Sequence, residues 1–191
     1  MRVKAVIFDL WETLIDWDRD ANAQLNVDLE AIVGGAFRDR WSGSKAKYNG
    51  PIRAALAEAG VAEEHMDDVC ALRREYLRKC LVPRPGAVDT LRKLRAEGVK
   101  VGLITVCSED IETLWPESEF AGLFDAEVFS SSFGASKPDP RIYLACCERL
   151  GVEPADAVFV GDGDADASHV RCVQLGGGCH GEASYSSYSL F

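Results

Sequence analysis

The sequence contains no uninterrupted apolar run of the length that crosses a lipid bilayer, about 18 residues. Its seven cysteines form no Cys-x-x-Cys pair and its three histidines show no ligand spacing, so neither a zinc site nor a disulfide framework is indicated. Positive charge is also scarce: 21 lysines and arginines face 31 aspartates and glutamates, giving a net charge of −10. Nucleic acids and anionic membranes are held by surplus positive charge, so we expect neither as a partner.

The first residues favour a strand over a targeting peptide. Arg2 and Lys4 precede only a short apolar stretch, Ala5–Phe8, which ends at Asp9. A secretory signal peptide has a longer apolar region and a small-residue cleavage site. With the cysteine pattern, this favours a reducing, cytoplasmic location. The length of 191 residues allows one domain with a modest insertion.

Short apolar runs alternate with helical patterns in most of the chain. Helical spacing over 86–97 and 139–150 ends in each case at a glycine, Gly98 or Gly151. Such alternation is typical of a parallel sheet covered by helices. The strands are predicted at residues 3–8, 99–104, 126–129 and 157–160.

Residues 15–83 carry no strand pattern. Apolar residues from Leu25 to Phe37 share one helical face. A second helix is predicted from Ile52 to Ala59, after Pro51, and a third from Met66 to Leu77. The sequence therefore predicts an all-helical insert over 15–83, within an α/β core made of residues 1–14 and 84–191.

Aspartates follow two of the predicted strands. Asp9 ends the first run, and Asp162 follows the fourth, with Asp166 close behind. In an open parallel sheet, ligands bind beyond the carboxyl ends of the strands, so these carboxylates converge if the strands are neighbours. Crowded carboxylates repel one another unless a hard cation such as Mg²⁺ lies among them. The alternative is that they are turn and capping residues.

A hydroxyl and an ammonium group complete the candidate site. Thr105 ends the second predicted strand, and Lys137 lies in a Ser-Lys-Pro-Asp-Pro loop. Beside a nucleophilic carboxylate, these two groups suit the oxygens and the charge of a phosphoryl group. Taken singly, Thr105 is an ordinary strand residue and Lys137 an ordinary solvated lysine.

In combination, these segments resemble the four motifs of the haloacid dehalogenase-like (HAD) hydrolase superfamily. The resemblance implies a Rossmann-like parallel sheet, and it identifies the helical insert as a cap of the C1 type. It covers about residues 1–175. The motifs lie at residues 6–16, 103–105, 136–143 and 160–166.

The resemblance implies covalent catalysis. Asp9 would attack phosphorus and form an aspartyl-phosphate that water then hydrolyses. Thr105 and Lys137 would hold the phosphoryl oxygens, and the cap would exclude water and read the leaving group. Mg²⁺ would be bound by Asp9, the backbone carbonyl of Trp11, Asp162 and Asp166. The residues expected to contact substrate are Trp11, Thr13, Val106 and Lys137.

One position departs from the family pattern. Trp11 stands where the phosphatases carry the aspartate that protonates the leaving group, and an indole cannot transfer that proton at neutral pH. The neighbouring Glu12 is a doubtful substitute, and we interpret Asp16 as structural. Three hypotheses follow: a Mg²⁺-dependent phosphatase of a small phosphorylated metabolite, a metal-independent 2-haloacid dehalogenase-like hydrolase, which would explain an aromatic residue there, and a non-catalytic binding protein.

The remaining expectations concern the tail and the partners. A strand normally follows the fourth motif in this family, so here it must come from the glycine- and serine-rich tail, 176–191, or be absent; we favour an irregular tail. Basic cap residues, among them Arg40 and Arg53, either attract an anionic small-molecule substrate or form a solvated face. The sequence leaves the identity of the substrate and the oligomeric state open.

Overall fold

The computed structural model describes residues 3–44, 48, 50–162 and 171–174. Its centre is a sheet of five parallel strands in the order β3-β2-β1-β4-β5. The central strand β1 has β2 on one side and β4 on the other, with Phe8 opposite both Leu103 and Val160. The strands are β1 (Ala5–Phe8), β2 (Lys100–Thr105), β3 (Ala126–Phe129), β4 (Ala157–Gly161) and β5 (Arg171–Gln174).

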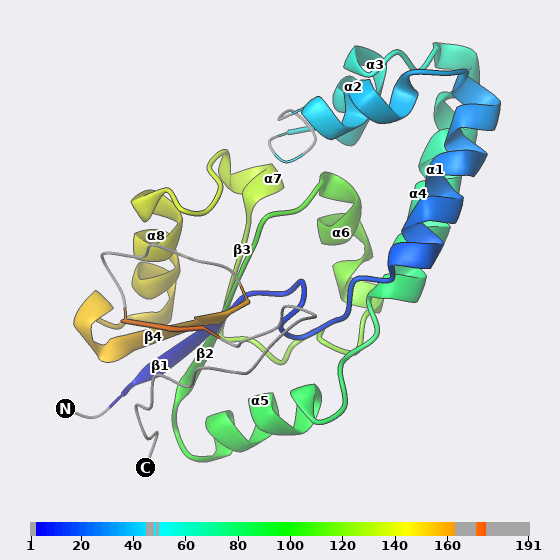
Figure 1. The fold of residues 1–191 in the computed structure, drawn as a ribbon. Coiled ribbons are helices and arrows are strands. Elements are labelled where there is room, and N and C mark those ends of the chain that lie inside the picture. Colours follow the sequence, from blue (N-terminus) through cyan, green and yellow to red (C-terminus); the bar gives the residue numbers. More distant parts are fainter. Residues whose placement is uncertain (1–2, 45–47, 49, 163–170, 175–191) are drawn as a thin grey trace.

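Alternate strand residues enter two separate cores, because successive side chains of a strand point to opposite faces. Val6 and Phe8 pack with Leu91 of α5 (Ala87–Ala96) and with residues of α6 (Glu109–Leu114). Ile7 packs on the other face, against α8 (Pro140–Leu150). This two-sided burial explains why the strands read as continuous apolar runs, and it confirms the predicted Rossmann-like α/β fold (Figure 1).

The helix boundaries near glycine were predicted correctly. Pro140 begins α8 behind an Asp139 cap, and Gly151 ends it in a left-handed conformation with φ 68°. Short elements were not anticipated, because three to six residues give little periodicity. These are α6, α7 (Ser130–Phe133) and the 3₁₀ helices η2 (Glu63–His65), η3 (Trp115–Glu117) and η4 (Pro154–Asp156).

The origin of the fifth strand is a correction. We expected it from the tail or not at all, whereas β5 is formed by Arg171–Gln174, just before the glycine run. Its sequence, Arg-Cys-Val-Gln, mixes polar and apolar residues, as an edge strand allows, and so it resembles no buried run. The tail 176–191 and Asp166 lie outside the described residues.

Residues 15–83, which we call the cap segment, contain four α-helices among their described residues and no strand there. In Figure 1, α1 and α4 run side by side away from the sheet, with α2 and α3 at their far end. None of the described helices is both long and apolar enough to cross a membrane. The helices are α1 (Arg19–Val33), α2 (Phe37–Gly43), α3 (Ile52–Glu58) and α4 (Met66–Cys80).

The periodicity of the stretch from Leu25 to Phe37 suggested a single helix, but the structure divides this stretch between two helices. It is divided at Gly34, whose φ of 86° leaves the helical region, and Phe37 begins α2. Glycine is a weak helix former and favours such a break. The buried faces of both helices still join one core, which explains why the apolar pattern continues across the break.

The chain enters and leaves the cap segment at one place. Ile15 forms an antiparallel bridge with Pro83, and the amide of Arg84 donates to the carbonyl of Leu14 at 2.8 Å. The boundaries predicted at 14/15 and 83/84 therefore lie side by side. The division into two domains stays a prediction.

Candidate active site

The carboxyl ends of three adjacent strands meet at the candidate site. Asp9 directly follows β1, Thr105 ends β2, and Asp162 directly follows β4. We expected Asp9 and Asp162 to converge if their strands were neighbours. β1 and β4 are adjacent in the sheet, so this condition is met. The site lies where ligands bind to open parallel sheets.

Asp9 is buried and paired. Its Oδ1 lies 2.6 Å from Nζ of Lys137 and also accepts a hydrogen bond from the amide of Leu10 at 2.7 Å. Burial raises the pKa of the Asp9 carboxyl above its ordinary value, the charge of Lys137 acts in the opposite direction, and the charge of Asp162 raises the pKa further. Asp9 and Asp162 therefore lie close enough to repel each other, although β1 and β4 are distant in sequence.

Lys137 is not a solvated loop residue. Its side chain is only 15% exposed, forms the ion pair with Asp9, and lies with Nζ 5.1 Å from the ring centroid of Phe159. The aromatic face adds a cation–π attraction that helps to hold the ammonium group in place. A phosphoryl group at Asp9 would meet this ammonium group directly.

Two threonines expected in the site have buried hydroxyls without a hydrogen-bond partner among the described residues, and neither threonine lines the cavity. The two hydroxyls are Oγ1 of Thr105, whose residue is fully buried, and Oγ1 of Thr13. Leaving a buried hydroxyl unsatisfied costs about 1–3 kcal/mol. An oxygen-rich ligand beside Asp9 would satisfy Thr105, which fits the role expected for it.

A cavity of about 610 Å³ lies between the core and the cap segment. Asp9, Lys137 and Val106 line it from the core, and the cap segment contributes several aromatic side chains. Of the residues expected to contact substrate, Thr13 is buried away from this lining. Arg40 and Arg53 do not line the cavity either; Arg40 donates to the carbonyl of Ala59, and Arg53 pairs with Asp67. The cap-segment residues of the lining are Trp17, Asn22, Leu25, Asn26, Leu29, Trp41, Ser42, Tyr48, Arg73, Tyr76 and Leu77.

Trp11 lines this cavity, and Glu12 is directed elsewhere. The Trp11 ring packs edge-on against Trp17, with centroids 5.0 Å apart. The Glu12 carboxylate accepts from the amide of Trp17 at 2.8 Å and pairs with Arg84, which also binds Asp16. Glu12 and Asp16 thus brace the connection to the cap segment, and Glu12 does not replace the missing proton donor.

The residues present fit a magnesium ion. Asp9 and Asp162 supply two mutually repelling carboxylates, and Mg²⁺ in proteins uses one or two carboxylates together with water and phosphate oxygens. No cluster of three or more His, Cys, Asp or Glu side chains with metal-binding geometry occurs among the described residues, which do not include Asp166. The carbonyl of Trp11 is the further donor expected from the family pattern.

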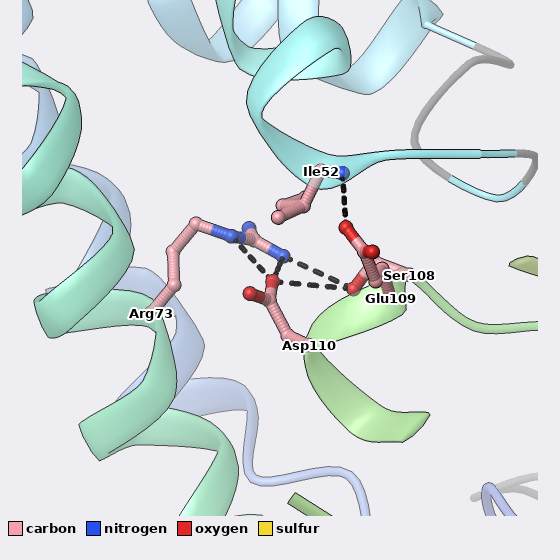
Figure 2. Close-up of polar contacts among 5 residues, drawn as sticks. All are labelled: Ile52, Arg73, Ser108, Glu109 and Asp110. Atoms are coloured by element: carbon pink, nitrogen blue, oxygen red, sulfur yellow. Dashed lines mark hydrogen bonds and ion pairs between the residues drawn. The ribbon is translucent and has the colours of Figure 1, made fainter. Parts of the chain in front are cut away.

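Polar contacts between the cap segment and α6 were missed by sequence reasoning. Arg73 of α4 reaches Asp110 and Ser108, and the amide of Ile52 donates to Oε2 of Glu109 at 2.8 Å (Figure 2). Arg73 stands among charged residues on an amphipathic helix, where arginines are ordinarily solvated. The signal that could have found it is its place at i+4 from Val69 and i+3 from Cys70, on the buried face of α4, which its neighbour Arg74 does not share.

Comparisons with known proteins agree with this geometry. A family model of haloacid dehalogenase-like hydrolases matches residues 3–171. Phosphoglycolate phosphatase of Aquifex aeolicus is 30% identical over 169 residues, which cover 86% of this chain and 78% of that protein. Phosphoglycolate phosphatase 1 of Pseudomonas aeruginosa is 32% identical over 189 residues, covering 90% of this chain and 69% of that protein.

A solved structure extends the likeness to the fold. A HAD family enzyme of Bacteroides thetaiotaomicron, in complex with magnesium and inorganic phosphate, superimposes with a TM-score of 0.64 at 18% identity, covering 90% of this chain and 93% of that one. The fold and the aspartates at its strand ends define a class of α/β hydrolases. This chain belongs to the haloacid dehalogenase-like hydrolases.

Proposed function

We propose that the protein is a Mg²⁺-dependent phosphatase that uses Asp9 as its nucleophile. The observation that carries this proposal is the 2.6 Å contact between Asp9 and Lys137 at the floor of the cavity. A carboxylate oxygen held against an ammonium group is placed to attack a phosphorus atom whose oxygens that ammonium group also attracts. The buried hydroxyl of Thr105 is the further donor for those oxygens.

The reaction then proceeds in two steps. An Asp9 oxygen forms a bond to phosphorus while the bond to the leaving oxygen breaks, and the leaving group departs with that electron pair and takes a proton from water, because Trp11 cannot supply one. Water attacks the resulting acyl phosphate and releases inorganic phosphate, which regenerates the Asp9 carboxylate. Asp9, Asp162 and the Trp11 carbonyl would hold Mg²⁺, which would supply charge neutralisation for the phosphoryl oxygens.

The proposed substrate is a small phosphorylated acid. Two relatives at 30–32% identity are phosphoglycolate phosphatases, and the candidate site combines a phosphoryl-binding floor with a separate cap wall.

We keep the cytoplasmic location as an expectation from the cysteine pattern.

The deciding experiment is a phosphate-release assay on the wild-type chain and Asp9→Asn. We expect Mg²⁺-dependent release that EDTA abolishes, and none from Asp9→Asn, because an amide is a poor nucleophile. Circular dichroism of both proteins checks that the variant is folded. Turnover that is independent of metal and of Asp9 would exclude the proposal.

Trp11 favours a second candidate, a 2-haloacid dehalogenase-like hydrolase. A halide leaves without protonation, so an aromatic residue near the nucleophile would be compatible with that chemistry. Chloride release from 2-chloropropionate that survives EDTA would support this candidate. If neither phosphate nor chloride is released, the non-catalytic hypothesis is the one that stands.

A further inference from the structure

Arg73 is a buried cation on the cap wall of the cavity. It lies on α4, is only 7% exposed, and lines the same cavity as Asp9 and Lys137. Burying a charge is costly unless it is paired and hydrogen-bonded. The cavity therefore has two positively charged side chains in its described lining, one from the core and one from the cap segment.

The guanidinium group of Arg73 is paired along only one edge. Its Nε and Nη2 both donate to the same oxygen of Asp110, Oδ2, at 3.0 and 2.7 Å, and Nη2 also donates to Oγ of Ser108 at 3.2 Å (Figure 2). Arginine has five N–H donors in a planar fork. Among the described residues, Nη1 makes no hydrogen bond, and it lies on the opposite side of the fork from Asp110.

The orientation of this group is fixed before a ligand binds. Cζ of Arg73 lies 4.5 Å from the ring centroid of Trp41, which itself stacks on Phe37 with centroids 6.0 Å apart. The ion pair and the aromatic face leave the side chain little rotational freedom. A pre-organised donor binds an anion with a smaller entropic cost than a mobile lysine does.

Arg73 is also connected to the phosphoryl end of the site. Its partner Ser108 lies three residues after Thr105, in the loop whose residues Val106 and Cys107 line the cavity. A ligand held at Asp9 therefore has Arg73 across the same cavity. A molecule with two anionic groups whose link spans the cavity would engage both cations.

We propose that Arg73 is a specificity-determining residue that binds a carboxylate on the leaving group through Nη1. This inference rests on the proposed phosphatase function and names the feature of the substrate that the cap segment reads. The Asp110 partner balances the charge of Arg73, so the site gains from a carboxylate chiefly by hydrogen bonding along the open edge. Charge-assisted hydrogen bonds of this kind are among the stronger ones in proteins.

A simpler role for Arg73 is to fasten the cap segment to α6, as the contact between Ile52 and Glu109 does. The two roles differ in what they predict for different substrates. A fastening residue affects all substrates alike, whereas a carboxylate-binding residue changes the preference between an acid and its neutral analogue. The test therefore compares 2-phosphoglycolate with 2-hydroxyethyl phosphate, which lacks the carboxylate.

The decisive variant is Arg73→Lys, which keeps a cation beside Asp110 but removes the planar fork and its second edge. We expect the ratio of kcat/KM for the two substrates to fall by about 10- to 100-fold, mainly through KM for 2-phosphoglycolate. Glu109→Ala is the matched control: it removes another polar contact between the cap segment and α6 and leaves Arg73 with its partners, so the ratio should change by less than about threefold. Equal losses on both substrates in Arg73→Lys, or no preference in the wild type, would overturn the proposal.

A binding measurement separates this proposal from the proposed function. The experiment compares the single variant Asp9→Asn with the double variant that adds Arg73→Lys. Each protein is titrated calorimetrically with 2-phosphoglycolate and with inorganic phosphate in the presence of Mg²⁺. We expect the second change to weaken binding of 2-phosphoglycolate by about 10-fold or more, and that of inorganic phosphate by much less. If the wild type releases no phosphate but this difference is found, the proposed activity is wrong and the carboxylate site stands. If 2-phosphoglycolate binds equally well to both proteins, the carboxylate site is wrong.

Discussion

At the scale of single residues, the chemistry of this site depends on which charged side chains bind to neighbouring structural residues and which face the cavity. Glu12 is bound to the Trp17 amide and to Arg84, so a carboxylate next to Trp11 in sequence is removed from the cavity. Lys137, by contrast, is withdrawn from solvent and set against Asp9. The sequence alone does not distinguish a charged residue with a structural role from one in the candidate site. Only the contacts in the structure distinguish the two roles.

Replacing Trp11 by aspartate should increase the rate of phosphate release. A positioned general acid contributes about 10²- to 10⁴-fold to a rate, so we expect a gain of about 10-fold or more, largest for alkyl phosphates with poor leaving groups. Steady-state kinetics on a series of phosphate esters measures it. Trp11→Phe is the control, since it removes the indole and adds no acid. A loss in Trp11→Asp as large as that in Trp11→Phe would contradict the missing-acid interpretation.

The Cys107 thiol should be unreactive although it lines the cavity. Burial raises its pKa to about 12, so at pH 8 the nucleophilic thiolate is a fraction on the order of 10⁻⁴. Alkylation by iodoacetamide, followed by peptide mass spectrometry, should label Cys107 slowly in the folded protein. The same reaction in guanidinium chloride is the control and should be rapid. Fast labelling of the folded protein would show that the thiol is activated.

At the scale of elements, the break between α1 and α2 is a feature of the backbone. Gly34 adopts φ 86° and ψ 168°, a region that side chains strain to occupy, whereas Gly35 is not in the positive-φ region. Neither glycine has an atom within 4 Å of the position where a Cβ would be added. The difference between the two positions is therefore one of conformation and not of space.

Gly34→Ala should destabilise the protein by about 1–3 kcal/mol, and Gly35→Ala should not. For a chain of this size, about 1 kcal/mol corresponds to about 2–4 °C in Tm. Thermal unfolding followed by circular dichroism measures both variants. If Gly34→Ala unfolds at the wild-type temperature, the positive φ at position 34 does not strain an alanine there, and the prediction is wrong.

A second element-scale prediction concerns the contact between β2 and α8. A Cβ on Gly102 would lie 2.8 Å from Sγ of Cys146 and 3.0 Å from Cδ1 of Leu150. Gly102→Ala should therefore cost about 1–3 kcal/mol through overpacking. Adding Cys146→Ala removes the closer atom and should restore part of that loss, which a double-mutant cycle of Tm values measures. Additive losses would mean that the two positions do not meet.

The elements also show how far sequence reasoning extends. The strands carrying Asp9 and Thr105 were predicted because buried parallel strands are continuous apolar runs, and α8 because Pro140 and Gly151 mark its ends. β5 was missed because an edge strand carries little pattern. Arg73 was missed for a different reason: its position on the apolar face of α4 marks it as buried, but its partner on α6 is set by a tertiary contact that the sequence does not show.

At the scale of the whole molecule, ligand binding should couple the sheet and the cap segment. Mg²⁺ with inorganic phosphate, each at about 100 times its Kd, should stabilise the folded protein by about 2.7 kcal/mol or more, which is about 5–11 °C in Tm. Differential scanning calorimetry measures this shift. Asp162→Asn should lose most of the Mg²⁺-dependent part and keep a smaller phosphate-dependent part. An unchanged shift in that variant would remove Asp162 from the metal site.

The bridge between Ile15 and Pro83 has a geometric consequence for the whole chain. Since residues 15–83 are attached through two adjacent crossings, their movement relative to the sheet is restricted to swinging about that double tether. The far ends of α1 and α4 then travel furthest. The contacts away from the tether include two polar ones, from Ile52 to Glu109 and from Arg73 to Asp110, beside an apolar core shared by the cap segment and the sheet. Opening of the cap segment must therefore separate both kinds of contact, and added salt should change it little, because the Arg73–Asp110 pair is buried.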